Sequence, residues 1–271
     1  MPRVKEYYRP SSLEEALALL QRSDCVTVPL AGGTRLVPRL RGDLPWSVDN
    51  QVDAVVDLAD LGLNGIERRS DPDGEWLTIG ATTTLTDLFE HADCRTVADG
   101  VLAEGAGREG PVNLRNAATV GGCIVQGASE SELLLALLAL DARVEVNDGM
   151  VRVQSLTDLV ANPAAAIGKG LITEIRIPLG GETLRGGAAR IARTPSDSAI
   201  IAAVAVGDGK TYRIALGGLS YQPLVIDLNK KEDWKEALET AVTEKGVLSD
   251  FRGSADYRRA MAAIVIERSL R

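Results

Sequence analysis

The pattern of apolar and polar residues near the start of the chain predicts a helix, a strand and a glycine turn, in that order. Residues 12–20 form the helix, because Ser12 and Glu15 make a capping box and apolar residues follow at i, i+3, i+4 and i+7 of a core-facing side. Residues 26–30 have the composition of a strand. This strand leads directly into Gly32-Gly33.

A second Gly-Gly pair lies in the most informative stretch of the chain, residues 113–142. A short apolar run there leads into Gly121-Gly122, and a polar turn then opens a helix whose start, Ser129-x-x-Glu132, has the form of a capping box. Consecutive glycines let a ligand approach the backbone closely, and a helix N-terminus offers unpaired N–H groups and the positive end of a dipole. The stretch therefore favours a phosphate-bearing ligand.

An ordinary turn is the alternative interpretation of such a pair, because the chain contains 27 glycines. The repetition favours a ligand instead. Residues 30–34 repeat the apolar-Gly-Gly-polar form directly after a predicted strand. Two such loops can converge on one pyrophosphate group.

The middle of the chain is predicted to be rich in strands. Asp71-Pro72-Asp73-Gly74 is a turn signal, Thr84-x-x-Asp87 resembles a helix cap, and Asn147-Asp148-Gly149 is a hairpin signal. The predicted strands cover residues 53–58, 75–79, 142–146, 150–153 and 171–177, and a short helix is predicted over residues 35–40.

A glycine-rich stretch, residues 178–187, marks the predicted boundary of a last unit. Beyond it the pattern indicates a hairpin and two helices, which form a small sheet with helices on one side. Ser254 is the predicted N-cap of the last helix, with Tyr257, Met261 and Ile264 on one apolar face. The other predicted elements are the hairpin strands 199–206 and 212–216 and the helix 234–242.

Composition and charge limit the classes of partner. The 271 residues are 45% hydrophobic and 25% charged, which is typical of a globular chain. The net charge is −8 without a basic cluster, which argues against nucleic acid or an anionic membrane as the main partner. No apolar stretch reaches membrane-spanning length and no signal-peptide core follows Met1, so we expect a cytoplasmic protein.

Residue types that usually carry catalysis or bind metals are sparse. The three cysteines are too widely spaced for a disulfide framework or an iron–sulfur site, and the single histidine, His91, lies in a polar segment. Residues 127–131 resemble G-x-S-x-G but end in serine, and the G-x-G-x-x-G of residues 105–110 follows a predicted helix rather than a strand. The sequence therefore predicts no metal site, no catalytic residue and no Rossmann site.

Four motifs together resemble one protein family. They are Ala31-Gly32-Gly33-Thr34 followed by Leu36, Thr78-Ile79-Gly80-Ala81 followed by Thr83-Thr84-Leu85, Arg115-Asn116-x-Ala118-Thr119-Val120-Gly121-Gly122, and Arg252-Gly253-Ser254-Ala255-Asp256-Tyr257-Arg258-Arg259. Over nearly its whole length, and in the same order, the chain is similar to the FAD-binding medium subunit of molybdenum hydroxylases, the family of xanthine and carbon monoxide dehydrogenases.

This resemblance implies an α+β fold with two domains. Residues 1–178 are expected to form a two-part FAD-binding domain of the PCMH type, which is vanillyl-alcohol-oxidase-like, with subdomains of about 1–60 and 61–178. Residues 179–271 are expected to form a small α+β domain similar to the C-terminal domain of CO dehydrogenase flavoproteins.

FAD is the cofactor that the resemblance implies. The two Gly-Gly segments would hold its pyrophosphate and ribityl chain, Ala81 and Thr83 would line it, and Leu171 would pack against the isoalloxazine. The only imidazole, His91, lies outside the motifs, so we expect FAD to be bound without a covalent bond. The expected FAD-binding residues are Ala31, Gly32, Gly33, Thr34, Arg35, Leu36, Ala81, Thr83, Ala118, Thr119, Gly121, Gly122, Glu132 and Leu171.

The sequence departs from the family pattern at several positions. Cys123 stands where an asparagine usually follows the Gly-Gly pair. Glu132 replaces an aspartate, and it is interpreted either as a cofactor ligand or as a helix cap. Arg193-x-x-x-Asp197 matches the family, but the aromatic residue and the lysine expected upstream have no equivalents in residues 187–190.

The function that the resemblance implies is electron transfer. In such complexes a molybdopterin large subunit oxidises the substrate, and a small subunit with 2Fe-2S clusters passes electrons to FAD, which returns them to an external acceptor. We therefore expect a hetero-oligomer with these two partner subunits. The alternatives are a stand-alone flavin oxidoreductase of the same fold and a flavin-free scaffold subunit; the paired Gly-Gly segments favour a flavin protein, and the lack of an acid–base constellation favours the electron-transfer subunit.

Overall fold

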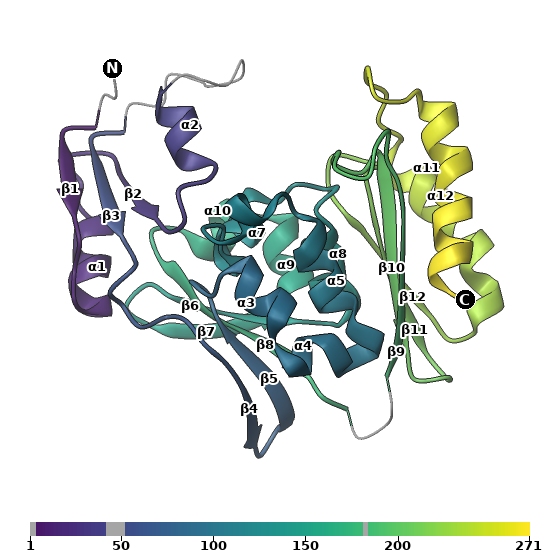
Figure 1. Cartoon of the computed structure of the whole chain (residues 1–271), viewed down its shortest axis with the longest axis horizontal. Helices are drawn as coiled ribbons and strands as arrows, with labels where there is room; N and C mark the ends of the chain where they lie inside the picture. Colours follow the sequence, from purple (N-terminus) through teal and green to yellow (C-terminus); the bar gives the residue numbers. More distant parts are fainter. Residues whose placement is uncertain (1–3, 42–51, 181–183) are drawn as a thin grey trace.

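The computed structural model of the chain describes residues 4–41, 52–180 and 184–271, which form three packed units (Figure 1). The N-terminal unit is a parallel sheet of order β1-β3-β2. Its core is small: Ala16, Leu17 and Leu20 of its first helix cluster with Val56 of the sheet. Its elements are β1 (Glu6–Tyr8), α1 (Leu13–Leu20), β2 (Thr27–Leu30), α2 (Leu36–Arg41) and β3 (Ala54–Asp57).

The middle unit is an antiparallel sheet of order β4-β5-β8-β6-β7 with a layer of helices against it (Figure 1). Its central helix, α8, is buried along its whole length, which explains its nearly continuous apolar sequence. The elements are β4 (Ile66–Asp71), β5 (Gly74–Gly80), α3 (Leu85–Glu90), α4 (Ala92–Thr96), a 3-10 turn (Val97–Gly100), α5 (Val101–Arg108), α6 (Val112–Arg115), α7 (Val120–Gln126), α8 (Glu132–Ala139), β6 (Arg143–Asn147), β7 (Val151–Ser155), α9 (Leu156–Ala161), α10 (Pro163–Ile167) and β8 (Leu171–Pro178).

The C-terminal unit is an antiparallel sheet of order β12-β11-β10-β9 with its long helices on one face (Figure 1), as the sequence predicts. Strand β10 is buried on both faces. Its residues Ala202 and Val204 join the core around α8, while Ile201 and Ala203 join the core under the C-terminal helices. The elements are β9 (Arg185–Ile191), β10 (Ile201–Gly207), β11 (Tyr212–Gly217), β12 (Leu224–Leu228), a 3-10 turn (Lys231–Asp233), α11 (Trp234–Lys245) and α12 (Ala255–Ser269).

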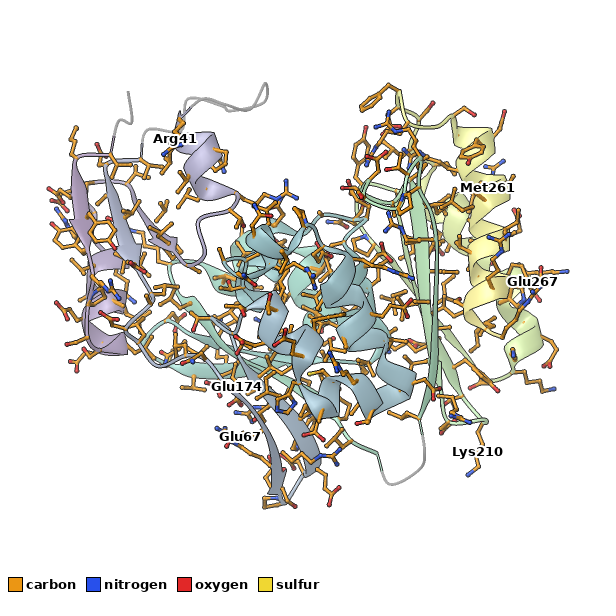
Figure 2. All side chains as sticks on the ribbon, in the orientation of Figure 1. Arg41, Glu67, Glu174, Lys210, Met261 and Glu267 are labelled. Atoms are coloured by element: carbon orange, nitrogen blue, oxygen red, sulfur yellow. The ribbon has the colours of Figure 1, made fainter. Side chains whose placement is uncertain are left out.

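The core around α8 extends across the layers, because side chains of α8 and of the C-terminal sheet fill the space between them (Figure 2). The segregated sheets and helices confirm the predicted α+β class. The predicted capping box at Thr84 and Asp87 and both predicted hairpins are present. Strands β1, β4, β9 and β12 were not predicted. Strand β1 has only three residues, and β4 and β9 have mixed polar sequences, whereas the mostly apolar β12 was missed.

Two predicted helix boundaries are wrong. Gly121 and Gly122 lie inside helix α7 rather than in a loop before a helix. Helix α8 begins at Glu132, and its N-cap is Ser131, whose hydroxyl accepts the N–H of Leu134 at 3.2 Å; Ser129 does not cap it. The predicted helix α8 is therefore present, but it begins later than predicted and is preceded by the unpredicted helix α7.

The predicted apolar face of α12 is offset by one residue. Ser254 is the N-cap, as predicted, and accepts the N–H of Tyr257. The buried side, however, carries Arg258, Ala262 and Val265, and Tyr257 is exposed. Hydrophobicity alone misplaces this face because its first buried residue is an arginine.

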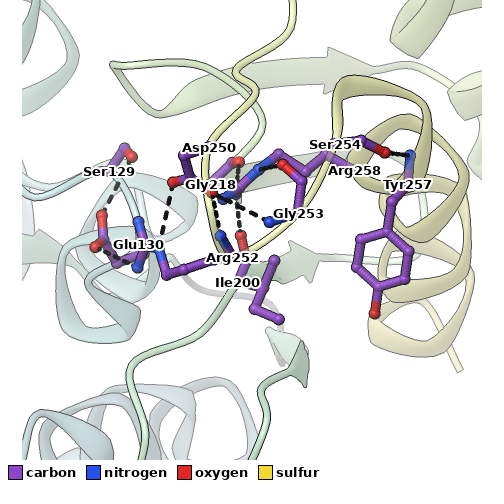
Figure 3. Close-up of polar contacts among 10 residues, drawn as sticks. All are labelled: Ser129, Glu130, Ile200, Gly218, Asp250, Arg252, Gly253, Ser254, Tyr257 and Arg258. Carbon is purple, nitrogen blue, oxygen red and sulfur yellow. Dashed lines mark hydrogen bonds and ion pairs between the residues drawn. The ribbon is translucent and has the colours of Figure 1, made fainter.

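Arg258 is fully enclosed, and its guanidinium hydrogen-bonds to described residues of the C-terminal unit (Figure 3). Its Nη1 donates to the carbonyl oxygens of Ile200 at 2.6 Å and Gly218 at 2.5 Å. Its Nη2 donates to Asp250 Oδ1 at 2.6 Å, and its Nε donates to the Gly253 carbonyl at 3.2 Å. A buried guanidinium is tolerated because it is paired and hydrogen-bonded on all sides. The arginine therefore ties α12 to the sheet and to the turn before it.

The neighbouring Arg252 connects this turn to the middle unit. Its Nη1 donates to Glu130 Oε1 at 3.0 Å, and its Nε lies 3.4 Å from Asp250 Oδ2 (Figure 3). Burial alone would raise the pKa of Asp250, but the Arg258 guanidinium and the backbone N–H of Arg252 outweigh it and lower that pKa to about 2. The Asp250 carboxylate therefore stabilises the fold in its charged form.

We expect Asp250→Asn to lower the free energy of unfolding of the full chain by about 1–2 kcal/mol at pH 7, after allowance for partial solvent screening. A carboxylate whose pKa is lowered by folding stabilises the protein at pH values above its unfolded-state pKa of about 3.9. This stabilisation is lost as the pH falls toward the folded-state pKa. Urea unfolding should therefore give the same gap between variant and wild type at pH 7 and pH 4.5, and about half that gap at pH 3. Glu239→Gln, an exposed change on α11, is the control and should show no gap. A gap that does not narrow at pH 3 would contradict the assignment.

Candidate functional site

The two Gly-Gly segments meet in the structure. A Cβ atom on Gly32 would lie 1.6 Å from the carbonyl oxygen of Ala117 and 3.1 Å from Cα of Ala118. Only glycine permits this backbone contact. The loop after β2 therefore rests directly on the segment that precedes α7, and the sequence prediction of two convergent loops agrees with this geometry.

The first loop, residues 31–36, has a backbone suited to an anion. Gly33 has φ +66°, a left-handed conformation that favours glycine, and its carbonyl accepts the N–H of Val37 at 3.0 Å to start α2. Within the described part of the chain, no backbone N–H of residues 32–36 has a hydrogen-bond acceptor. Consecutive free N–H groups in a glycine turn form a concave site for phosphate.

The second segment uses its N–H groups within the protein. Val120 N–H donates to Thr83 O at 3.1 Å, Gly121 N–H donates to Ala81 O at 2.9 Å, and Gly122 N–H donates to the Thr119 hydroxyl at 3.2 Å. These contacts contradict the expectation that this glycine pair presents free amides. A Cβ on Gly121 would lie 2.9 Å from Ala81 O, so its glycine is required for close packing.

The N-terminus of α8, predicted to attract a phosphate, holds a carboxylate of the protein instead. Glu109 accepts the Ser131 hydroxyl at 2.6 Å and the Leu133 N–H at 3.0 Å. Burial raises the pKa of Glu109, whereas these two hydrogen bonds lower it. Sequence reasoning missed Glu109 because its partners are distant in the chain. The only local signal was its position in the rejected G-x-G-x-x-G stretch.

Glu132 forms a buried ionic link between two units. Its carboxylate pairs with Arg108 of α5 at 2.9 Å and with Arg190 of β9 at 3.2 Å. Burial raises the pKa of Glu132, and the hydrogen bond from Arg108 lowers it. Arg190 also donates to the carbonyl oxygen of Asp197. Glu132 therefore does not cap α8 with its side chain; it holds the loop with the Arg193–Asp197 ion pair against the helix layer.

The remaining predicted residues fall into two groups. Ala81, Thr83 and Thr119 are buried beneath the junction, where the Thr83 hydroxyl bonds to the backbone of Gly65. Leu171 is also buried and lines an apolar cavity of about 290 Å³ between β2, α7 and α10. The residues that reach solvent at the junction are Ala31, Gly32, Gly33, Thr34, Arg35, Leu36, Ala118 and Gly122.

Cys123, at the position where the family has asparagine, is a neutral thiol. Burial and the nearby Glu109 raise its pKa to about 12, although Arg35 acts in the opposite direction. The thiol is therefore unreactive at neutral pH. Arg35 lies close enough to Glu109 to lower its pKa as well, so a positive charge accompanies the free amides of the first loop.

No metal-binding group of three or more His, Cys, Asp or Glu side chains occurs in residues 4–41, 52–180 and 184–271. None of the helices over the same residues is long and apolar enough to cross a membrane.

Residues 3–180 match the family model described as the FAD-binding domain in molybdopterin dehydrogenase. The chain belongs to this family. It is 33% identical to the uncharacterized protein YgfM of Escherichia coli, over 97% of this chain and 94% of that protein. It is 28% identical to the carbon monoxide dehydrogenase medium chain of Afipia carboxidovorans, over 100% and 96% of the two chains.

Solved structures show the same fold. A chain of Cu,Mo-CO dehydrogenase superposes with a TM-score of 0.83 at 26% identity, covering 100% of this chain and 97% of that one. Quinoline 2-oxidoreductase of Pseudomonas putida 86 gives a TM-score of 0.81 at 22% identity over 98% and 95% of the chains, a likeness of fold. The predicted family, the α+β FAD-binding fold and the oxidoreductase class are thereby confirmed.

We expect Gly33→Val to weaken FAD binding at least about tenfold, because a branched residue disfavours φ +66° and its Cβ would press on Val37 at 3.1 Å. Gly209→Val is the matched control: Gly209 also has positive φ, but it lies in the β10–β11 turn with open space around it. Both changes should cost about 1–2 kcal/mol of stability. Flavin content and the affinity for added FAD, both measured by fluorescence, should be reduced only in Gly33→Val. Wild-type affinity in Gly33→Val would show that this loop does not bind the cofactor.

Proposed function

We propose that this chain is the FAD-binding electron-transfer subunit of a multi-subunit molybdenum-dependent hydroxylase or dehydrogenase. Its family is defined by FAD binding in molybdopterin dehydrogenases, and its relatives include proteins named as medium chains of carbon monoxide and glyceraldehyde dehydrogenases. The proposal rests on the backbone contact between Gly32 and Ala117. In the loop that makes this contact, the N–H groups of residues 32–36 have no acceptor among the described residues.

The first loop fits a dinucleotide pyrophosphate. Its free N–H groups donate to phosphate oxygens, and Arg35 adds a positive charge. Ala118 and Gly122 form the adjoining wall, while Ala81, Thr83, Thr119 and Gly121 shape it from beneath. Glu132 acts through Arg190 by holding the loop of Asp197 in place, and Leu171 contributes to the apolar wall.

Residues 1–178 and 179–271 correspond in this proposal to the FAD-binding domain and the C-terminal domain. When bound, FAD supplies the chemistry: it accepts electrons from an iron–sulfur centre and passes them to an external acceptor. The protein binds and orients the cofactor and sets the charge around it. An iron–sulfur small subunit and a molybdopterin large subunit provide the electron source, and the choice of substrate belongs to the large subunit.

A stand-alone flavin oxidoreductase of the same fold is the second candidate. It would need a substrate site with a group that moves a proton beside the flavin. The carboxylates near the junction are already engaged, Glu109 at the start of α8 and Glu132 with its two arginines. This favours the subunit of a complex. A flavin-free scaffold would not need free N–H groups in the first loop.

Acid treatment should release all the flavin from the purified chain. Nδ1 of the single histidine, His91, accepts the N–H of Asp93 at 3.3 Å and caps α4, which is a structural role. After acid precipitation the absorbance near 450 nm should appear in the supernatant, and His91→Ala should leave the flavin content unchanged. Yellow colour retained in the pellet would contradict non-covalent binding.

The electron-transfer role is tested on the native complex. A tagged chain isolated from its own organism should carry an iron–sulfur subunit and a molybdopterin subunit through gel filtration, because stable interfaces bury about 1,600 Å². Adding the substrate should reduce the iron centres and then bleach the flavin. Recovery of an active homo-oligomer without molybdenum and iron would instead support the stand-alone oxidoreductase.

A further inference from the structure

Arg115 of α6 carries a charge that no described residue compensates. Its Nε and Nη1 are enclosed without a hydrogen-bond acceptor, and they are the only such side-chain atoms in the described residues. The guanidinium also has no ion pair with any described residue. Enclosed polar groups are nearly always satisfied in folded proteins, so this exception marks a guanidinium with unused donors, which an acceptor from outside the chain can reach only at Nη2. Its Nη2 is the nitrogen that is not enclosed.

Arg115 is one of two guanidinium groups on the same aromatic ring. Its Cζ lies 4.9 Å from the centre of the Phe89 ring, and Cζ of Arg95 lies 5.4 Å from it. Arg95 donates to the carbonyl oxygen of Phe89 and has no carboxylate partner among the described residues. The ring fixes Arg115 through a cation–π contact but leaves its hydrogen-bonding capacity unused.

Exposed apolar side chains lie on the two short helices that carry this ring and Arg115. Phe89 is 37% exposed, and Val112 and Leu114 of the adjoining α6 are 57% and 44% exposed. We call Phe89, Arg95, Val112, Leu114 and Arg115 the Phe89 patch. Aromatic residues and arginine are enriched at the centres of protein interfaces. The whole chain has a net charge of −8, whereas the Phe89 patch contains two arginines and no acidic residue.

We propose that the Phe89 patch is a docking surface for a partner subunit, and that an aspartate or glutamate of that subunit pairs with Arg115. The proposal rests on the proposed function, which supplies the partner. A carboxylate fits because the planar guanidinium recognises it with directed hydrogen bonds. The apolar side chains around it fit a protein surface rather than a free anion. Arg115 is held by Phe89 of α3 and lies close to Gly107 of α5, and neither of these two residues belongs to a Gly-Gly segment.

Zero-length cross-linking of the native complex tests the pairing directly. Arg115→Lys places an amine at this position, and a carbodiimide should join it to an aspartate or glutamate of a partner subunit, identified by peptide mass spectrometry. Arg259→Lys, an exposed change on α12, is the matched control and should give no such link. An intact complex in which the Arg115→Lys amine links to no partner carboxylate would overturn the proposal.

Arg115→Gln gives the second measurement. We expect its affinity for the partner to fall about 10–100-fold, because truncating one member of a partly buried pair leaves the other unpaired. Its FAD content should stay at the wild-type level. Loss of FAD with unchanged partner affinity would assign Arg115 to the cofactor and overturn the docking surface, while leaving the proposed function intact. A wild-type chain that binds FAD but purifies without any partner would refute both proposals.

Discussion

The backbone contact between Gly32 and the carbonyl oxygen of Ala117 determines how the candidate site is assembled. It uses no side chain, so it is lost with any residue other than glycine. Gly33 then turns the chain into α2 and leaves the N–H groups of residues 32–36 without an acceptor in the described chain. Attachment of the N-terminal unit and the proposed anion site therefore depend on the same few residues.

The charges around this contact are arranged by the protein before any ligand binds. Glu109 satisfies the start of α8, and Glu132 is shared between Arg108 and Arg190. A phosphate therefore has no free helix N-terminus at α8, which leaves the first loop as the proposed anion site. Fixed charges of this kind need little rearrangement when a cofactor binds, which favours affinity.

Local patterns predicted the elements that local physics determines. The hairpin at residues 147–149, the first helix and the two Gly-Gly segments all have signals within a few residues. The errors come from distant partners. Position 121 requires glycine because it packs on Ala81, and the buried side of α12 begins with Arg258 because sheet carbonyls and Asp250 surround it. Neither fact is encoded in the neighbouring sequence.

Strand β10, buried on both faces, determines which parts of the molecule can move. Its alternate residues belong to two cores, so rotating the C-terminal unit away from α8 would expose Ala202, Val204 and Val206 together to water. The N-terminal unit has only a small core of its own, closed by Leu171. A rigid-body motion of the N-terminal unit would therefore separate fewer buried apolar side chains than one of the C-terminal unit.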